Sequence, residues 1–464
     1  MSVIAPGTRW YNAVWRWHFY AGMICIPFIL WLSITGSIYL WKPQIEALID
    51  QPYARVAVAG QPRASAAAIA LAAQASVPGS MLHRYQLPDT PDQAVQVIVG
   101  RHAREYRSYV HPQSLAILKT VAEDQRIMRL IFRLHGELLI GDPGSWIVET
   151  AACWAIVMIL TGLYLWWPRG TKGLAGILWP RLHRGGRAFW RDIHAVTGIW
   201  VGLLGLALIL TGLPWANVWG GYLKEVRALT GATDGPQDWS TSSHEGHHGM
   251  IMNDPGMAAM MGDHAEHRGM TMAHVRTDDA PLDRIIANVA PLHLAGPVLI
   301  APPTTEDGLW TAKSDAGNRP LRVNLTIDGA SGTIVKREDF AERHWIDRAV
   351  GYGVAGHEGQ LFGLPNQVLS TVAAMGLILL AISGTILWWR RRPIGLLGAP
   401  LPLGRPRFGP LLIGGILALG ILFPMFGGTL ITTLILERCL LRLFPTLSHW
   451  LGLRRALPLP DRVG

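Results

Sequence analysis

The sequence predicts a polytopic α-helical membrane protein with two tandem repeats of two transmembrane helices, a fifth C-terminal apolar segment, and an α+β domain in each of two long loops. Half of the 464 residues are hydrophobic and only 16% are charged, whereas average proteins carry about 25% charged residues. Several stretches of about 20 residues hold almost no charge, and a helix of that length crosses a bilayer core. An internal repeat of histidines and glycines is the third observation that predicts this class.

Four spans are clear along the chain, and a fifth apolar stretch is ambiguous. Pro424, Gly427 and Gly428 interrupt the fifth stretch, so it is compatible with one kinked span or with two shorter re-entrant pieces. The predicted order is the N-terminus with the first span 1–41, the first outer domain 42–145, the second span 146–167, a basic loop 168–193, the third span 194–215, the second outer domain 216–367, the fourth span 368–389, a basic loop 390–409, the fifth stretch 410–436 and a tail 437–464.

Basic residues in the short loops orient the spans. The loop 168–193 holds six Lys or Arg against a single acid, Asp192, and the loop 390–409 holds five Arg and no acid. Lys and Arg concentrate on the cytoplasmic side of a membrane. The N-terminus and both basic loops are therefore predicted to be cytoplasmic, and the two long loops to lie outside. Because the basic clusters adjoin apolar spans, the net charge of +9 does not indicate nucleic acid as a partner.

Each long loop is predicted to fold as a small α+β unit, because helical and strand-like segments follow in the same order in both. In the first loop, the expected elements are a helix over 64–76, strands at 83–87, 94–99 and 105–111, and a helical segment at 124–134. In the second, they are a helix over 281–289 and strands at 296–301, 309–313, 321–327 and 333–337, the last two joined at Asp328-Gly329.

One repeated pattern surrounds the first and third spans. A histidine is followed after 4 residues by a glycine and after 17 residues by a Thr-Gly pair. The two copies are His18, Gly22 and Thr35-Gly36, and His194, Gly198 and Thr211-Gly212. Equal spacings on corresponding spans indicate two copies of one structural element.

A second pattern surrounds the second and fourth spans. A histidine is followed by a glycine after 6 residues, a proline after 8, a Thr-Gly or Ser-Gly pair after 26 and a Trp-Trp pair after 31. The two copies are His135, Gly141, Pro143, Thr161-Gly162 and Trp166-Trp167, and His357, Gly363, Pro365, Ser383-Gly384 and Trp388-Trp389. Two spans per copy give both copies the same orientation, so the repeats are parallel, related by an axis along the membrane normal.

The predicted topology places the four histidines in two pairs at opposite membrane faces. His18 and His194 begin spans that run outward, near the cytoplasmic face, whereas His135 and His357 precede spans that run inward, near the outer face. Neutral imidazole is a good axial ligand of haem iron, and one histidine from each of two facing helices gives a six-coordinate iron suited to electron transfer.

Two glycines support the haem interpretation. Gly22 and Gly198 lie one turn beyond His18 and His194 on the same helix face, where the missing side chains leave room for a flat macrocycle. The residues alone leave other roles open for the four histidines. They could be interfacial or capping residues, catalytic imidazoles, members of a proton relay or ligands of another metal. His344 is a further candidate near the outer face, but it has no repeat partner.

Five motifs resemble the family of bacterial membrane proteins with PepSY-associated transmembrane helices, which includes iron-regulated inner-membrane ferric-siderophore reductases. The motifs are Trp17-His18-Phe19-Tyr20-Ala21-Gly22, Leu134-His135-Gly136-Glu137-Leu138-Leu139, Thr161-Gly162-Leu163-Tyr164-Leu165-Trp166-Trp167-Pro168-Arg169, Asp192-Ile193-His194-Ala195-Val196-Thr197-Gly198 and Gly356-His357-Glu358-Gly359-Gln360-Leu361-Phe362-Gly363. The resemblance covers about residues 10–393. It implies periplasmic PepSY-type domains, b-type haems held by these four histidines, and electron delivery outward to a ferric chelate.

The second long loop contains a segment rich in histidine and methionine. The second copy of the repeat has 46 more residues between its two histidines than the first, and much of this excess lies in residues 244–274. Thioether and imidazole together suit Cu(I), whereas imidazole alone also accepts Cu(II) or Zn(II). The predicted ligands are His244, His247, His248, Met250, Met252, Met257, Met260, Met261, His264, His267, Met270, Met272 and His274. A flexible polar loop that binds no metal is the alternative interpretation.

The leading hypothesis from the sequence is an oxidoreductase, a di-haem b reductase in a bacterial inner membrane, with no catalytic residues apart from the haem ligands. It would pass electrons to a periplasmic ferric-siderophore or copper substrate. The short cytoplasmic loops lack a GxGxxG motif after a strand, so the electrons are expected from a quinol or a separate donor protein. The alternative is a non-enzymatic membrane scaffold whose outer domains bind a metal or a protein. A transporter is disfavoured because no span centre carries a charged residue.

Overall fold

The computed structural model describes residues 6–453 except 59, 61, 169–172, 231–280, 305–306 and 404–407. The chain divides into two compact units. The helical unit comprises residues 1–37, 135–226 and 369–464, and the sheet unit comprises residues 38–134 and 227–368. Most of the predicted spans thus fall in the first unit, and most of the two long loops in the second.

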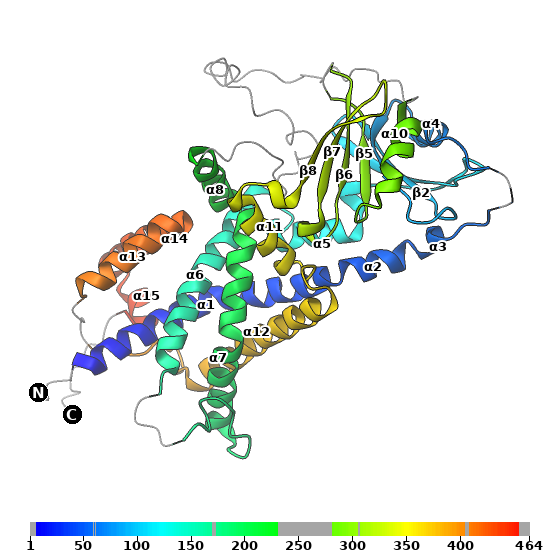
Figure 1. Cartoon of the computed structure of the whole chain (residues 1–464). Helices are drawn as coiled ribbons and strands as arrows, with labels where there is room; N and C mark the ends of the chain where they lie inside the picture. Colours follow the sequence, from blue (N-terminus) through cyan, green and yellow to red (C-terminus); the bar gives the residue numbers. More distant parts are fainter. Residues whose placement is uncertain are drawn as a thin grey trace, which may run out of the picture. The chain divides into compact units, whose positions relative to one another are not determined.

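Long apolar helices dominate the helical unit (Figure 1). They are α1 (Pro6–Leu40), α6 (Asp142–Trp166), α7 (Gly186–Gly212) and α12 (Leu364–Arg391). Within the described part of the chain, these four helices are long and apolar enough to cross a membrane. The four predicted spans are therefore confirmed as helices. Helices α6, α7 and α12 are longer than their predicted spans because they continue through flanking residues, such as Arg187 and Arg191 in the first two turns of α7.

The glycine and proline of the second repeated pattern form the starts of α6 and α12. Gly141 (φ 69°) and Gly363 (φ 62°) have left-handed backbone immediately before these helices, a conformation that glycine adopts without a steric penalty. Pro143 and Pro365 then lie in the first helical turn, where the missing N–H would have had no helical partner. The glycine 6 residues and the proline 8 residues after each histidine therefore mark where the following helix begins.

The fifth apolar stretch forms two helices, α13 (Pro410–Leu422) and α14 (Pro424–Leu443), followed by the short α15 (Pro445–Trp450). The helix breaks at Phe423-Pro424, because proline cannot supply the N–H of a continuing helix. Helix α13 has 13 residues, which extend about 20 Å and thus fall short of a bilayer core of about 30 Å. Phe423 and Phe426 pack against Cys153 and Ile156 of α6, so the helix pair is attached to the helical unit.

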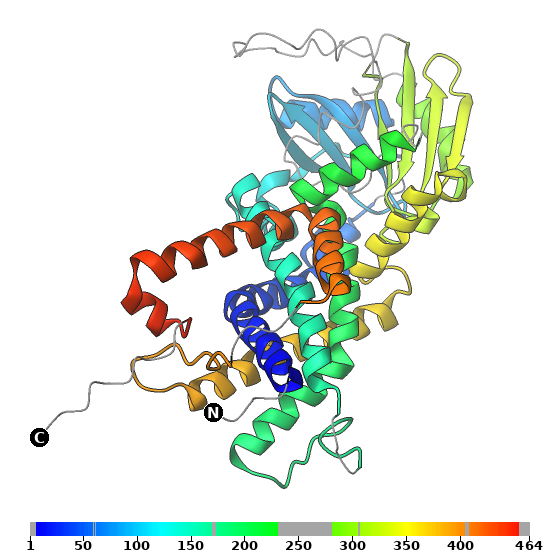
Figure 2. The same ribbon diagram turned by 90° about the vertical axis from the view of Figure 1, so that its left-hand side faces the viewer.

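The sheet unit contains one antiparallel sheet that is eight-stranded over the described residues. The first loop supplies β1 (Met81–Leu87), β2 (Val95–Arg101), β3 (Arg104–Val110) and β4 (Ile117–Ala122), and the second supplies β5 (Val298–Ala301), β6 (Leu309–Ser314), β7 (Val323–Asp328) and β8 (Ile334–Asp339). The order is β4-β3-β2-β1-β5-β6-β7-β8, and Figure 2 shows the blue and yellow-green sets of strands. Pairing of β1 with β5, with Tyr85 opposite Ile300, joins the two loops into one sheet, where the sequence predicted two outer domains.

Two helices, α4 (Ala66–Ser76) and α10 (Pro281–Val289), lie beside each other against this sheet (Figure 1). Their buried residues Ile69 and Ile285 share one hydrophobic core with Trp310, Ile300 and Leu325 from the strands. The carboxylate of Asp283 in α10 also accepts hydrogen bonds from the first N–H groups of α4, from Ala66 at 2.5 Å and Ala67 at 3.2 Å. Both loops therefore share one core.

The two predicted helical segments of the sheet unit differ in how well their bounds were predicted. The helix predicted over 281–289 has these bounds in the structure. The segment predicted over 124–134 is instead a 3₁₀ turn followed by α5 (Ile127–Glu137). Strand β4 was not predicted. It is an edge strand whose residues do not alternate between buried and exposed positions, so it lacks the period-two signal of a half-buried strand.

Candidate functional site

His18 on α1 and His194 on α7 face each other within the helical unit. Their ring centroids lie 6.4 Å apart, with an angle of 77° between the ring planes. The two residues occupy equivalent positions in the repeat, so the contact joins the two copies. Both side chains are partly buried. The structure thus brings together the first pair of predicted ligands.

Hydrogen bonds from helix α6 define the tautomer of His18. Its Nδ1 lies 3.0 Å from the carbonyl oxygen of Met158 and 3.2 Å from Oγ1 of Thr161. The Thr161 hydroxyl donates its single proton to the Val157 carbonyl at 2.7 Å, so it accepts from the histidine. Nδ1 therefore carries the proton and donates, and Nε2 keeps the lone pair that a metal ligand needs.

His194 has the same arrangement against helix α12. Its Nδ1 donates to the Leu380 carbonyl at 3.2 Å and to Oγ of Ser383 at 3.1 Å. The Ser383 hydroxyl donates to the Leu380 carbonyl at 3.1 Å, so its oxygen is again the acceptor. Both histidines are held as the tautomer with the lone pair on Nε2.

The glycine after each hydroxyl residue lets the neighbouring helix approach the imidazole. A Cβ added at Gly162 would lie 3.1 Å from Cε1 of His18, and one added at Gly384 would lie 3.3 Å from Cε1 of His194. These distances are shorter than most contacts of a real Cβ atom. We call each Thr-Gly or Ser-Gly pair that contacts a histidine in this way a hydroxyl–glycine cradle.

His135, at the end of α5, lies in a third hydroxyl–glycine cradle. Its Nδ1 lies 2.9 Å from Oγ1 of Thr35, and that hydroxyl donates to the Trp31 carbonyl at 2.8 Å. A Cβ at Gly36 would lie 3.1 Å from Cε1 of His135. Three of the four histidines therefore meet a Thr-Gly or Ser-Gly pair from another helix. The sequence displays these pairs at constant spacings, but the spacings do not reveal which histidine each pair contacts.

His357 belongs to the sheet unit, where it is the last residue of α11 (Trp345–His357). The next residue, Glu358, forms an ion pair with the buried Arg319 at 3.4 Å, which ties this end of α11 to the 3₁₀ turn that follows β6. His344 caps the other end of α11, because its Nδ1 accepts a hydrogen bond from the Ile346 N–H at 3.3 Å. His344 therefore has a structural role.

Space remains beside the two glycines predicted to admit a macrocycle. A Cβ added at Gly22 would approach only the sulfur of Met158 within 4 Å, at 4.0 Å, and one at Gly198 would approach only Leu380, at 3.7 Å. Neither glycine is needed for close helix packing. The open space agrees with the predicted role of both residues.

The residues around the His18–His194 pair fit a haem group. Two axial imidazoles on one metal, with bonds of about 2.0 Å, have their ring centroids roughly 6 Å apart, and the observed separation is 6.4 Å. Each Nδ1 is engaged by protein acceptors, as is usual for histidines that bind a metal through Nε2. The donor set, its spacing and the glycines agree with a bis-histidine haem.

The predicted copper ligands, residues 244–274, lie outside the described residues. Within the residues that are described, no group of three or more His, Cys, Asp or Glu side chains is placed to hold a metal ion. The paired histidines are therefore the metal-ligand candidates that the described structure offers.

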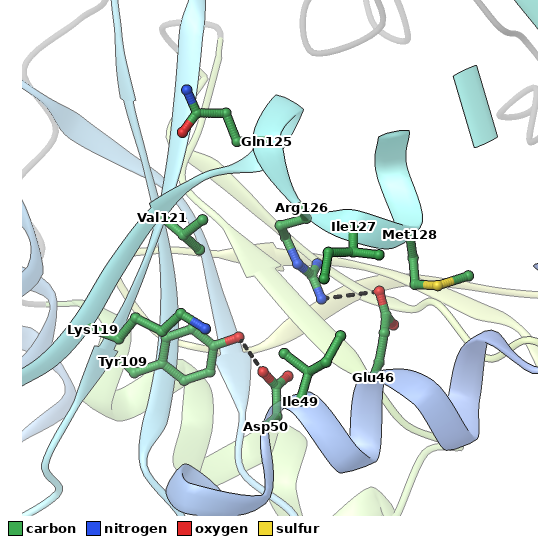
Figure 3. A pocket seen from close by; sticks show the side chains of 10 residues that line it. All are labelled: Glu46, Ile49, Asp50, Tyr109, Lys119, Val121, Gln125, Arg126, Ile127 and Met128. Carbon is green, nitrogen blue, oxygen red and sulfur yellow. Dashed lines mark hydrogen bonds and ion pairs between the residues drawn. The ribbon is translucent and has the colours of Figure 1, made fainter. Parts of the chain in front are cut away.

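The sheet unit contains a small pocket of about 110 Å³ between α2 (Lys42–Ile49), β3, β4 and the start of α5 (Figure 3). Tyr109 donates to Asp50 at 2.8 Å, and Arg126 pairs with Glu46 at 3.0 Å. Burial, followed by the bond to Asp50, raises the pKa of Tyr109, so this phenol stays protonated. Lys119 lies 5.6 Å from the Tyr109 ring centroid. The pocket is too small to enclose a drug-sized ligand, for which volumes of about 300 Å³ or more are usual.

Comparison with known proteins agrees with this architecture. A search of curated proteins finds none that matches the chain. The family model of the PepSY-associated TM region matches residues 15–391, which include most of α1, all of α6, α7 and α12, the four repeated histidines and both long loops. The chain therefore belongs to the family of membrane proteins that contain the PepSY-associated TM region.

Proposed function

We propose that this protein is a di-haem b reductase of a bacterial inner membrane, which passes electrons outward to a periplasmic ferric-siderophore or copper substrate. The observation that carries the proposal is the His18–His194 pair, with ring centroids 6.4 Å apart and both Nδ1 atoms hydrogen-bonded to protein oxygens. A bis-histidine haem is a one-electron carrier whose iron has no open position, so it suits electron transfer rather than oxygen chemistry.

Neighbouring residues fix the tautomer and orientation of both imidazoles. Nδ1 of His18 donates to the Met158 carbonyl and the Thr161 hydroxyl. Nδ1 of His194 donates to the Leu380 carbonyl and the Ser383 hydroxyl. Such partners orient a ligand and increase its basicity. Because each cradle comes from the neighbouring helix, the ligand orientation depends on the packing of α1 on α6 and of α7 on α12.

The second haem is assigned to His135 and His357. His135 lies in the same kind of cradle as His18, which supports a ligand role for it. Its pairing with His357 rests on the sequence repeat, in which these two histidines have four matching spacings. In the predicted topology this haem lies on the side of the long loops, where a substrate outside the cell membrane would be reduced.

The proposed overall reaction balances with a quinol as the reductant. One quinol is oxidised to a quinone, releasing two protons and two electrons, and two Fe(III) chelates each accept one electron to give Fe(II). Fe(II) binds hard oxygen ligands less tightly than Fe(III), so reduction weakens the chelate. A separate electron-donor protein could replace the quinol without changing the roles of the four histidines.

Reconstituted vesicles test the proposal. Purified protein is placed in liposomes with a reduced quinone in the bilayer and a ferric hydroxamate chelate outside, and a coloured Fe(II) chelator reports iron reduction. We expect steady Fe(II) formation, and its loss in His18→Ala and His194→Ala. His183→Ala is the matched control, because His183 is exposed in the basic loop and should leave the rate unchanged. Equal rates in wild type and both ligand variants would contradict the proposal.

A copper-capturing scaffold is the second candidate, favoured by the six histidines and seven methionines of residues 244–274. In this case deletion of residues 244–274 abolishes Cu(I) binding by the purified protein, measured by competition with a chromogenic chelator, while the histidine pairs have no redox role. A protein that binds Cu(I) but carries no haem would favour the scaffold over the reductase.

A further inference from the structure

Arg391, on helix α12, lies beside the His18 helix. Its guanidinium carbon is 4.7 Å from the ring centroid of Trp15 and 5.4 Å from that of Phe19. Trp15 precedes His18 by three residues and Phe19 follows it directly, so Arg391 contacts the turn of α1 that carries the ligand. Arg391 follows Ser383, which holds His194, by eight residues on the same helix.

A second arginine lies close to the first. Arg187 precedes His194 by seven residues on α7, which is two helical turns and therefore the same helix face. Burial lowers the pKa of Arg391, and the charge of Arg187 adds to this effect. The two cations belong to the helices that carry and support His194.

Two nearby arginines pair with an acidic side chain, whereas no such pair is found for Arg391 or Arg187 among the described residues. Arg181 and Arg191 both pair with Asp192, at 2.6 and 2.8 Å. Arg391 donates to the Gly398 carbonyl at 2.8 Å. Arg391 is partly buried and Arg187 is exposed, and a partly buried cation beside a second cation is unfavourable unless an anion joins them.

We propose that Arg391, assisted by Arg187, binds the propionate carboxylates of the haem held between His18 and His194. This assignment rests on the proposed function. Haem b carries two carboxylates on one edge of its ring, and guanidinium is the side chain best suited to pair with carboxylates in a fixed geometry. The aromatic rings of Trp15 and Phe19 hold the guanidinium in place through cation–π contact.

Redox titration of the purified protein tests the assignment through a property other than activity. Removing a cation near a haem favours the oxidised iron, so Arg391→Gln should lower the midpoint potential of one haem. The expected effect is about a ten-fold change in the one-electron equilibrium constant, or 59 mV. The lowered potential should also acquire a pH dependence between about pH 5 and 7, because a partly buried carboxylate without its cation titrates in this range.

Arg390→Gln is the matched control. It removes the same charge at the adjacent position, but Arg390 is exposed and points to a different helix face. We expect the potential of this variant to stay within a two-fold change of the wild-type equilibrium constant. Equal shifts in the two variants would overturn the assignment, because they would reflect only the general field of the basic loop.

Three further outcomes separate the possible failures. Wild-type protein without haem would contradict the proposed function itself. Wild-type protein with two haems, whose potentials do not change in Arg391→Gln, would overturn only the propionate assignment. If this variant instead lost a co-purifying anionic phospholipid, detected by mass spectrometry, the arginines would bind a lipid phosphate and the propionate assignment would be wrong.

Discussion

The hydroxyl–glycine cradle gives the repeated Thr-Gly and Ser-Gly pairs a chemical role. In the three cradles described, the hydroxyl donates a hydrogen bond to its own helix and accepts one from Nδ1 of a histidine on another helix. The following glycine removes a side chain that would otherwise touch the imidazole ring. Replacing either residue should therefore disturb a ligand without removing it.

Thr161→Val tests this role at the residue scale. Valine has nearly the same shape but cannot accept a hydrogen bond from Nδ1 of His18, which keeps only the Met158 carbonyl as a partner. Loss of such a supporting partner typically lowers metal affinity by about 10- to 100-fold, and we expect a value near the lower end. Titration of haem-free protein with haem measures this affinity, with Thr161→Ser as the control that restores the hydroxyl. Unchanged affinity in Thr161→Val would show that the hydroxyl is dispensable.

The sequence predicted the four candidate ligands but not their supporting partners. His18 and His194 stand out because histidine is rare near apolar spans and because both have the same spacing to a glycine. Thr161 and Ser383 were visible only as small residues of a repeat. Their contacts with histidine depend on the register between neighbouring helices, which tertiary packing sets and local sequence does not encode.

At the scale of elements, patterning predicted the long helices well and the edge of the sheet poorly. The spans α6 and α12 carry a strong apolar signal, and their starts coincide with Gly-x-Pro sequences. Strand β4 begins with two adjacent exposed apolar residues, Ile117 and Leu118. Its sequence therefore lacks the alternation of apolar and polar residues that predicts a half-buried strand. The break between α13 and α14 follows from Pro424, but the sequence left one kinked span and two shorter pieces open, and the structure has two helices.

An ion-pair network between β1 and β3 makes the sheet unit sensitive to acid. Burial raises the pKa of Glu105, but the hydrogen bond from His83 at 3.0 Å and the charge of Arg84 outweigh it and lower the pKa to about 2. Since the folded pKa lies below the ordinary value of 4.5, the stabilisation is complete above about pH 4.5 and is lost as the pH falls toward 2.

Glu105→Gln should therefore destabilise the protein at neutral pH by about 1–3 kcal/mol, and the difference from wild type should shrink below pH 4.5. Unfolding in detergent at pH 7, 4 and 3, followed by circular dichroism, measures the effect. A difference that stayed constant from pH 7 to pH 3 would contradict the role of the ionised carboxylate.

At the scale of the whole molecule, the repeat extends from the histidines to the sheet. Each loop supplies four strands and one helix, α4 or α10, to the shared core of the sheet unit, and the two sets meet at the β1–β5 pair. The sequence predicted an α+β fold for each loop, but not their union. Pairing between strands about 200 residues apart is a non-local property, and neither strand carries a local signal for it.

A shared core predicts that the two loops unfold together. Ile300→Ala removes a fully buried side chain next to the β1–β5 pair and should destabilise the sheet unit by about 2–5 kcal/mol. Limited proteolysis should then cleave both loops at similar rates, whereas Val335→Ala, at a position 60% exposed, should behave as wild type. Cleavage confined to residues 281–344 would show that the loops fold independently.

The central claim is that paired histidines of the two repeat copies hold two haems. The most direct measurement is the reduced-minus-oxidised visible spectrum of detergent-purified protein, with haem counted as its pyridine complex. Our account predicts low-spin b-type bands and about two haems per chain, falling to about one in His18→Ala and in His194→Ala. A colourless protein from haem-replete cells, or an unchanged haem count in both variants, would contradict it.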